Sequence, residues 1–118
     1  MLAVTPHGIP DQRYGTHGHV VIKLAKAFEE AADIVREDGK ALLVGRIRGT
    51  HDDFGVIRLK AGGALDTSFS GDGIVRIDVA GSTDAAADGL LQPNGKLVVA
   101  GQSWRDGVPR FALSRILT

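Results

Sequence analysis

The chain has 118 residues, of which 43% are hydrophobic and 24% are charged, a balance typical of one folded domain. Its 14 basic residues cancel its 14 acidic residues at a pI near 6.9, so no overall field favours nucleic acid or an anionic membrane as a partner. It has no cysteine, which excludes disulfides, thiolate zinc sites and cysteine nucleophiles.

No stretch of the sequence approaches the roughly 20 apolar residues that a membrane-spanning helix needs. The first residues also lack the basic start and the long apolar segment of a signal peptide. If Met1 is the natural start, we therefore expect a cytoplasmic protein. If the chain is a piece of a longer secreted protein, this expectation does not apply.

The chain contains an internal repeat. Residues 38–45 (DGKALLVG) return as residues 94–101 (NGKLVVAG), 56 positions later. A repeated supersecondary unit indicates a repeat architecture. We therefore predict one two-repeat domain, with a first unit at about residues 11–60 and a second at about residues 66–117. Matches at spacings of 55 and 57 extend the correspondence: Asp11 with Asp66, Tyr14 with Phe69, Gly18 with Gly73, and Phe54 with Phe111.

The start of the chain carries a short apolar segment. Residues 2–4 precede residues 57–59, the tail of the first unit's last predicted strand, by 55 positions. Two interpretations stay open. Residues 2–4 are either a fragment of a unit that another chain completes, or a frayed leader.

Next along the chain, His17 and His19 are the candidate metal ligands. Because one residue separates them, they would share a face if the segment were extended, as a strand presents two imidazoles to one metal. However, Gly18 between them favours a turn, and no recognised motif supplies a third ligand. We therefore expect solvated loop histidines in preference to a metal site, and no cofactor.

Residues 24–36 are ambiguous between helix and strand. In the register of the repeat, Ile34 and Val35 stand opposite Leu90 and Leu91, immediately before the equivalent turn. We favour a strand because tertiary context overrides local propensity, and the helix stays as the alternative. The helical interpretation depends on an amphipathic stripe formed by Leu24, Phe28, Ala31, Ala32 and Val35.

The second unit has the clearer pattern. It predicts four strands at residues 74–79, 85–91, 96–101 and 110–116, with a tight turn at residues 92–95. Residues 102–109 are expected to form a loop. Four antiparallel strands in about fifty residues are typical of one β-propeller blade. On the last strand, the side chains expected to face the core are those of Phe111, Leu113 and Ile116.

Several segments of the second unit closely resemble the bacterial delta-60 repeat family. They are residues 63–69 (GALDTSF), Gly73, residues 90–101 (LLQPNGKLVVAG) and residues 111–115 (FALSR). The resemblance covers nearly the whole chain, although the first unit departs from the pattern at residues 8–14 and 25–31. It implies a β-propeller with blades of this length, and it brings no catalytic residues.

The predicted fold class is all-β, with two four-stranded antiparallel propeller blades per chain. A propeller closes with 4 to 8 blades, and a repeat architecture needs at least ~3 units to cover its apolar faces. Two blades would leave sheet faces and edges exposed to aggregation. We therefore expect homo-oligomerisation into a closed propeller, with a cyclic homotrimer favoured over rings of two or four chains.

The expected function is that of a noncatalytic structural or interaction module. No serine lies in a nucleophile elbow, and the aspartates lack the ligand spacing of a calcium loop. The alternative is a multivalent carbohydrate-binding propeller, in which Trp104, beside Arg105, stacks on a sugar. An enzyme comes third. The expected partners are further copies of the chain and, in addition, a glycan or protein ligand.

Overall fold

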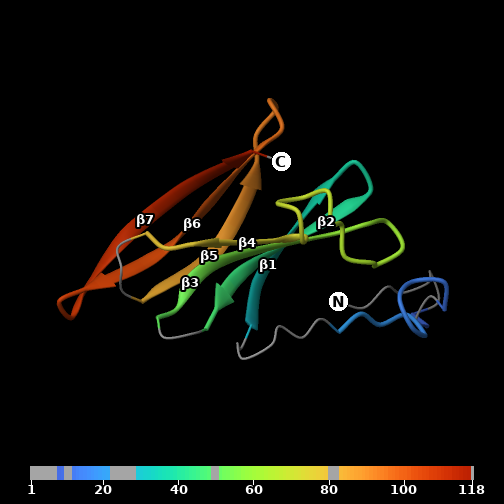
Figure 1. Ribbon diagram of the computed structural model, residues 1–118, viewed down its shortest axis with the longest axis horizontal. Helices are drawn as coiled ribbons and strands as arrows, with labels where there is room; N and C mark the ends of the chain where they lie inside the picture. The colour runs from blue at the N-terminus through green and yellow to red at the C-terminus, as the bar shows by residue number, and fades with distance from the viewer. Residues whose placement is uncertain (1–7, 10–11, 22–28, 49–50, 80–82, 118) are drawn as a thin grey trace.

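The computed structural model describes residues 8–9, 12–21, 29–48, 51–79 and 83–117. Within these ranges the chain forms two antiparallel β-sheets (Figure 1). No helix among these residues is long and apolar enough to cross a membrane. The first sheet contains β1 (Glu29–Glu37), β2 (Lys40–Ile47), β3 (Asp53–Leu59) and β4 (Ile74–Ile77), in that order. The second contains β5 (Asp84–Leu91), β6 (Lys96–Arg105) and β7 (Val108–Leu117), also in that order.

The segment that was ambiguous in sequence contains strand β1. Ile34 pairs with Leu43 and Val35 pairs with Leu42, so the favoured strand is confirmed from Glu29 onward. The remainder of the ambiguous segment, residues 24–28, lies outside the described residues. The strand forms in place of the helix because β1 pairs with β2 through backbone hydrogen bonds and also packs beside β5.

Two hairpins are built on Asp-Gly turns. Asp38 and Gly39, with φ of 46° and 80°, join β1 to β2, and Asp106 and Gly107, with φ of 51° and 74°, join β6 to β7. Two positive φ values are the signature of a type I′ turn, whose twist matches that of the flanking strands. The loop predicted at residues 102–109 is therefore wrong, because β6 and β7 run to either side of this two-residue turn.

Strand β4 belongs to the first sheet and not, as the repeat suggested, to the second unit. It pairs with β3, where Phe54 lies opposite Ile77 and Ile57 opposite Ile74. The two sheets therefore have four and three strands among the described residues, where four and four were expected. A sequence period fixes the spacing of strands but not which sheet each one joins. Residues 60–73 return the chain to the open edge of β3 before it crosses to β5.

Local details repeat in the structure at the sequence spacing. Both sheets carry a bulge on their first strand, between Ala31 and Asp33 and between Ala86 and Asp88. The turn residues also match, because the N–H of Gly18 donates to the carbonyl of Tyr14 (2.9 Å) as that of Gly73 donates to Phe69 (2.7 Å). The bulge and the glycine turn therefore recur at the spacing of the sequence repeat.

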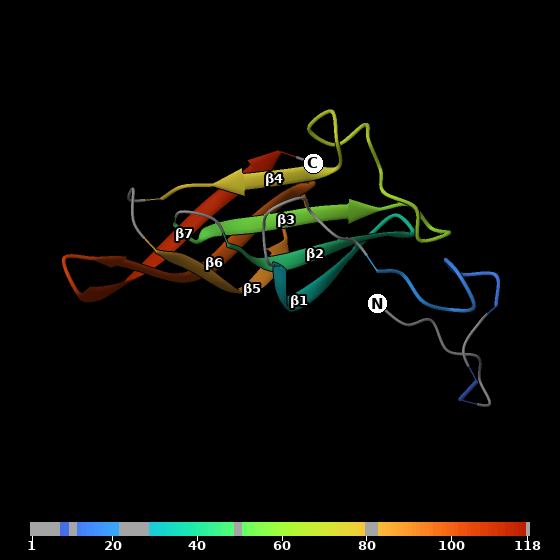
Figure 2. The same cartoon turned by 60° about the horizontal axis from the view of Figure 1, so that its bottom comes forward.

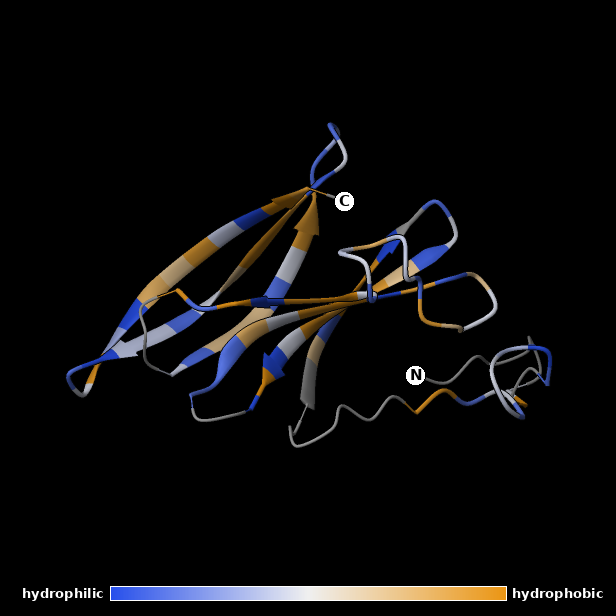
Figure 3. Cartoon of the chain, in the orientation of Figure 1, coloured by the Kyte–Doolittle hydropathy of each residue, from blue (hydrophilic) through white to orange (hydrophobic). Residues whose placement is uncertain are grey.

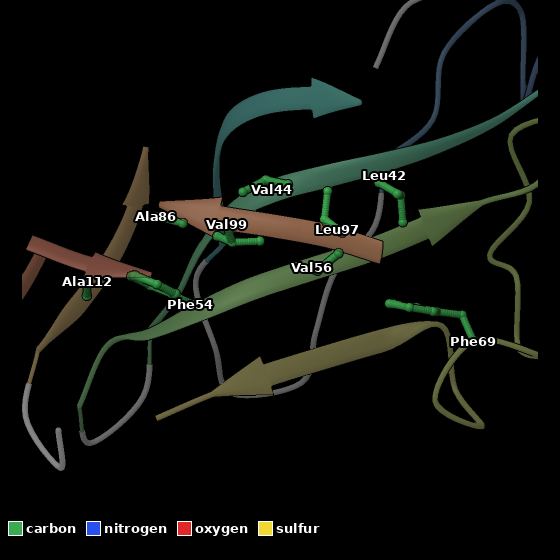
Figure 4. Close-up of a cluster of buried hydrophobic side chains, with 9 residues drawn as sticks. All are labelled: Leu42, Val44, Phe54, Val56, Phe69, Ala86, Leu97, Val99 and Ala112. Carbon is green, nitrogen blue, oxygen red and sulfur yellow. The ribbon is translucent and has the colours of Figure 1, made fainter. Parts of the chain in front are cut away.

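The main core lies between the two sheets, whose strands run obliquely to each other (Figure 2). Side chains of β2 and β3 meet side chains of β5, β6 and β7, and Phe69 closes the cluster at one end (Figure 4). Each fully buried Leu, Val or Phe contributes roughly 1.5–3 kcal/mol. The buried set is Leu42, Val44, Phe54, Val56, Phe69, Ala86, Leu97, Val99 and Ala112.

A second, smaller cluster covers the back of the first sheet. Its buried members are Ala41, Ile57 and Leu59. Val20, from the N-terminal segment, packs against them together with Leu43, Leu65 and Ile74. The first sheet therefore has apolar contacts on both faces, whereas the second sheet is covered on one.

Candidate functional site

The outward face of the second sheet carries large apolar side chains that the chain itself does not cover. We call this set the uncovered face; it consists of Leu90, Trp104, Phe111, Leu113 and Leu117. Phe111 is fully exposed, and Leu90, Leu113 and Leu117 each expose more than two thirds of their surface. β7 is hydrophobic in its middle and at its C-terminal end, with a hydrophilic band between the two (Figure 3). Exposed apolar surface of this kind marks an interaction site.

The first-sheet counterparts of Phe111 and Leu113 are buried, whereas Arg48 and Lys60, the counterparts of Trp104 and Leu117, are exposed. Arg46 pairs with Phe54 as Gln102 pairs with Phe111, so the two phenylalanines occupy the same place in two identical registers. Phe54 is 0% exposed, as is Val56, the counterpart of Leu113. The second sheet covers them. A third sheet, packed on the second sheet as the second packs on the first, would cover the uncovered face.

The prediction that Phe111 and Leu113 face the core of the chain is therefore wrong. Their neighbour Ala112 is the buried residue, and Ile116 packs at the margin of the main core. Which face of a strand is buried depends on what packs against each face. Because β7 is apolar on both, alternation alone could not decide it.

The outer edge of β7 is open as well. In the first sheet, β3 has β2 on one side and β4 on the other. Its counterpart β7 pairs with β6, and no strand among the described ranges follows it. The second sheet therefore combines an uncovered face with an unpaired edge, the two features that promote association between chains.

A carboxylate joins the inner strands of the two sheets. Asp33 Oδ2 on β1 accepts a hydrogen bond from the backbone N–H of Gly89 on β5, at 3.0 Å. That N–H also lies 2.8 Å from Asp88 Oδ1. The hydrogen bond from the Gly89 N–H holds the pKa of Asp33 below its ordinary value. A Cβ at position 89 would lie 2.9 Å from Val44 Cγ2, so glycine allows this close approach.

A small cavity of about 150 Å³ lies at the same seam. It is lined by Ala32, Arg46, Ala85 and Ala86. The guanidinium of Arg46 also lies 3.5 Å from the carboxylate of Asp52. Because the cavity is smaller than the roughly 300–1,000 Å³ typical of ligand sites, and its cation is already compensated, it does not define a small-molecule pocket.

Asp66, which is 2% exposed, organises the connection between β3 and β4. Its Oδ1 accepts from the hydroxyl of Ser68 at 2.6 Å. Its Oδ2 lies 2.9 Å from Lys40 Nζ and 3.0 Å from Arg58 Nε. The Ser68 hydroxyl and Lys40 hold the pKa of Asp66 far below its ordinary value. Arg58 also stacks over Phe69, 4.6 Å from the ring centroid, so the network anchors the main core.

Three carboxylates converge beside the start of β5. The side chains of Asp53, Asp78 and Asp84 bring one oxygen each within 4.8 Å of the others. Asp84 accepts from the Ser103 hydroxyl at 2.6 Å and from the Val79 N–H at 2.8 Å, and Asp53 lies 3.2 Å from Arg76. These contacts give two of the carboxylates a structural role. Sequence reasoning did not group them because they come from three separate elements.

The two histidines considered as metal ligands lie in the N-terminal turn. His17 has a φ of 53°, and its Nδ1 lies 2.9 Å from Gln12 Oε1. His19 forms an isolated bridge with Thr16, and both rings are exposed. The segment is a turn and not an extended strand, as Gly18 indicated. In the portion of the chain that is described, neither histidine belongs to a group of three possible ligands.

Trp104 and Arg105 lie at the end of β6, two residues and one residue, respectively, before the Asp-Gly turn. Trp104 is 39% exposed and its backbone N–H donates to the carbonyl of Thr83, at 2.8 Å. Its strand position places the indole on the uncovered face, on the same side as Phe111. Arg105 pairs with Val108 and is exposed.

The fold is all-β, and its two antiparallel sheets, packed face to face at one sequence period, have the arrangement of propeller blades. The chain matches the family described as "Domain of unknown function (DUF5122) beta-propeller" over residues 36–69 and 92–118. These segments make up just over half of the chain, which belongs to this β-propeller family. No curated protein and no solved structure matches the chain. The finer resemblance to the delta-60 repeat stays a prediction.

Proposed function

We propose that this chain is a noncatalytic interaction module whose copies assemble, sheet against sheet, into a closed β-propeller. The observation that carries the proposal is the contrast between Phe54 and Phe111. The two residues occupy equivalent positions in the two sheets, yet Phe54 is buried and Phe111 is fully exposed. A further sheet against β7 would remove this difference. Copies of the same chain provide such sheets.

The geometry of association is head to tail. The uncovered face belongs to the second sheet, and the back of the first sheet presents the exposed Ile34 and half-buried Leu43. These are two different surfaces of one chain, so the contact is heterologous, and heterologous contacts close into rings when the rotation divides the circle. Three chains give six blades, within the 4 to 8 of known propellers, and we favour this cyclic homotrimer.

The noncatalytic assignment is supported by how the buried acidic groups are used. Both oxygens of Asp84 accept hydrogen bonds from Ser103 and Val79. Asp66 is held by Ser68, Lys40 and Arg58. A general acid or base needs a free position facing a substrate. These two carboxylates have structural partners instead.

Light scattering during gel filtration at micromolar concentration tests the assembly. The proposal expects a mass three times the 12.4 kDa of the chain. Masses of two or four chains would preserve self-assembly and replace the trimer by another ring. A mass of one chain would overturn the proposal.

Carbohydrate binding is the second candidate, and the partial exposure of Trp104 beside Arg105 favours it. An indole at a propeller rim can stack on the apolar face of a sugar, and a ring would repeat the weak site by symmetry. Titration of the single tryptophan's fluorescence against a glycan panel tests this function. Saturable quenching by one glycan supports it, and an unchanged spectrum with every glycan contradicts it.

A further inference from the structure

The first sheet supplies a template for the strand that the second sheet lacks. On the outer edge of β3, Gly55 pairs with Arg76, Val56 with Val75 and Ile57 with Ile74. The Arg58 N–H also donates to the Gly73 carbonyl, at 3.0 Å. Shifted by the 57 residues that separate Phe54 from Phe111, the same edge of β7 consists of Ala112, Leu113 and Ser114.

A counterpart of β4 exists near the start of the chain. Shifted by the 55 residues that separate Gly18 from Gly73, β4 corresponds to the segment beginning at His19. The two segments also follow equivalent turns, because Gly18 and Gly73 have φ of 85° and 83°. Among the described residues, this segment belongs to neither sheet, and the second sheet has three strands.

The N-terminal segment is already in the place that a neighbouring sheet would require. Val75 of β4 packs against the core between the two sheets. Its counterpart Val20 packs against Ala41, Ile57 and Leu59 on the back of the first sheet, where the core with a preceding sheet would form. The next residue, Val21, is 91% exposed. The segment and β7 of the same chain lie apart in both views of the molecule (Figures 1 and 2).

We propose that residues 19–21 of one copy form the fourth strand of the second sheet of another copy, antiparallel to β7. The inference rests on the proposed self-assembly and specifies its contact. The register follows from the template: Val21 opposite Ala112, Val20 opposite Leu113, and His19 opposite Ser114. One docking event then pairs the open edge of β7 and places Phe111 and Leu113 against the back of the neighbouring first sheet.

Engineered disulfides test this register, and the natural absence of cysteine leaves no background. The test pair is His19→Cys with Ser114→Cys, both at positions that are not buried. The control pair is His19→Cys with Arg110→Cys, which keeps the N-terminal cysteine and moves its partner four residues along β7. This step is about 13 Å. It exceeds the Cα separation of at most about 7 Å that a disulfide allows.

The decisive format uses two single-cysteine chains, one with His19→Cys and one with Ser114→Cys, mixed in urea and refolded together. Only a contact between different chains can then give this mixed disulfide. Circular dichroism of each variant confirms that it folds before oxidation. We expect the in-register mixture to give a covalent dimer in at least about tenfold excess over the mixture of His19→Cys with Arg110→Cys.

The outcomes separate the inference from the function on which it rests. A multimeric mass with preferential in-register cross-linking supports both. A multimeric mass with no preference between the two mixtures overturns the strand pairing and leaves self-assembly in place. A wild-type mass of one chain overturns the proposed assembly and the strand pairing with it.

Discussion

Asp33 on β1 accepts a hydrogen bond from the backbone N–H of Gly89, a residue of the other sheet 56 positions later in the chain. The bond spans one sequence period and connects β1 of the first sheet to β5 of the second. The bond lies at the seam, beside the close contact of Gly89 with Val44. The effect of removing it on the free energy of unfolding therefore reports its contribution to the packing of the two sheets.

Replacing Asp33 by Ala should therefore lower the free energy of unfolding by about 1 kcal/mol, the net value of one hydrogen bond. Asp33→Asn is the matched control, because the amide keeps an oxygen acceptor for the Gly89 N–H. Urea unfolding at pH 7 followed by far-UV circular dichroism measures the difference. Equal midpoints for the alanine and asparagine variants would show that the acceptor contributes nothing to the seam.

Phe54 and Phe111 offer a matched test of the uncovered face. Phe54→Ala should cost about 3–5 kcal/mol and leave the chain largely unfolded, because it empties the main core. Phe111→Ala removes a side chain that the chain does not bury, and should keep a cooperative unfolding transition. Its mass by light scattering should fall toward the 12.4 kDa of one chain. Retention of the multimeric mass would place the interface elsewhere.

Asp66 should make stability depend on acid. Its folded-state pKa lies below the unfolded-state value of about 3.9, so its contribution is fully present well above that value. The contribution is lost as the pH falls from the unfolded-state pKa toward the lower folded-state pKa, because the folded form then resists a proton that the unfolded chain accepts.

The Asp66→Asn variant should therefore be less stable than the wild type at pH 7, and the gap should narrow at pH 3. Urea midpoints at the two pH values measure this. Asp106→Asn is the control, since asparagine also suits the type I′ turn between β6 and β7. A gap for Asp66→Asn that does not change with pH would show that charge is not what stabilises this site.

Gly101 on β6 is required by the bulge of β5. A Cβ at this position would collide with the carbonyl oxygen of Ala85 and would lie 2.7 Å from Ala86 Cα. Both are backbone atoms that cannot move aside without disturbing the ladder, so Gly101→Ala should cost about 1–3 kcal/mol. Thermal unfolding of this variant can be compared with Gly62→Ala, whose added Cβ has no atom within 4 Å. Equal melting temperatures would contradict the prediction.

Sequence patterns predicted much of the local structure correctly. The repeat at Gly39 and Gly95 indicated the duplication, and the register of Ile34 and Val35 decided for a strand against a helical stripe. The hairpin at Asp106 and Gly107 was missed, although Asp-Gly is a strong turn signal. The sequence pattern predicted a loop at residues 102–109 in its place.

Periodicity and turn residues predicted the strands of this all-β chain, because both are local properties that neighbouring residues express directly. The packing of the folded chain was needed to learn that β4 joins β3, that Asp33 reaches Gly89, and that Phe111 is exposed where Phe54 is buried. Each of these depends on which surfaces meet. Phe54 and Phe111 occupy equivalent positions of the repeat, and they differ in burial because a second sheet packs against one of them and not against the other.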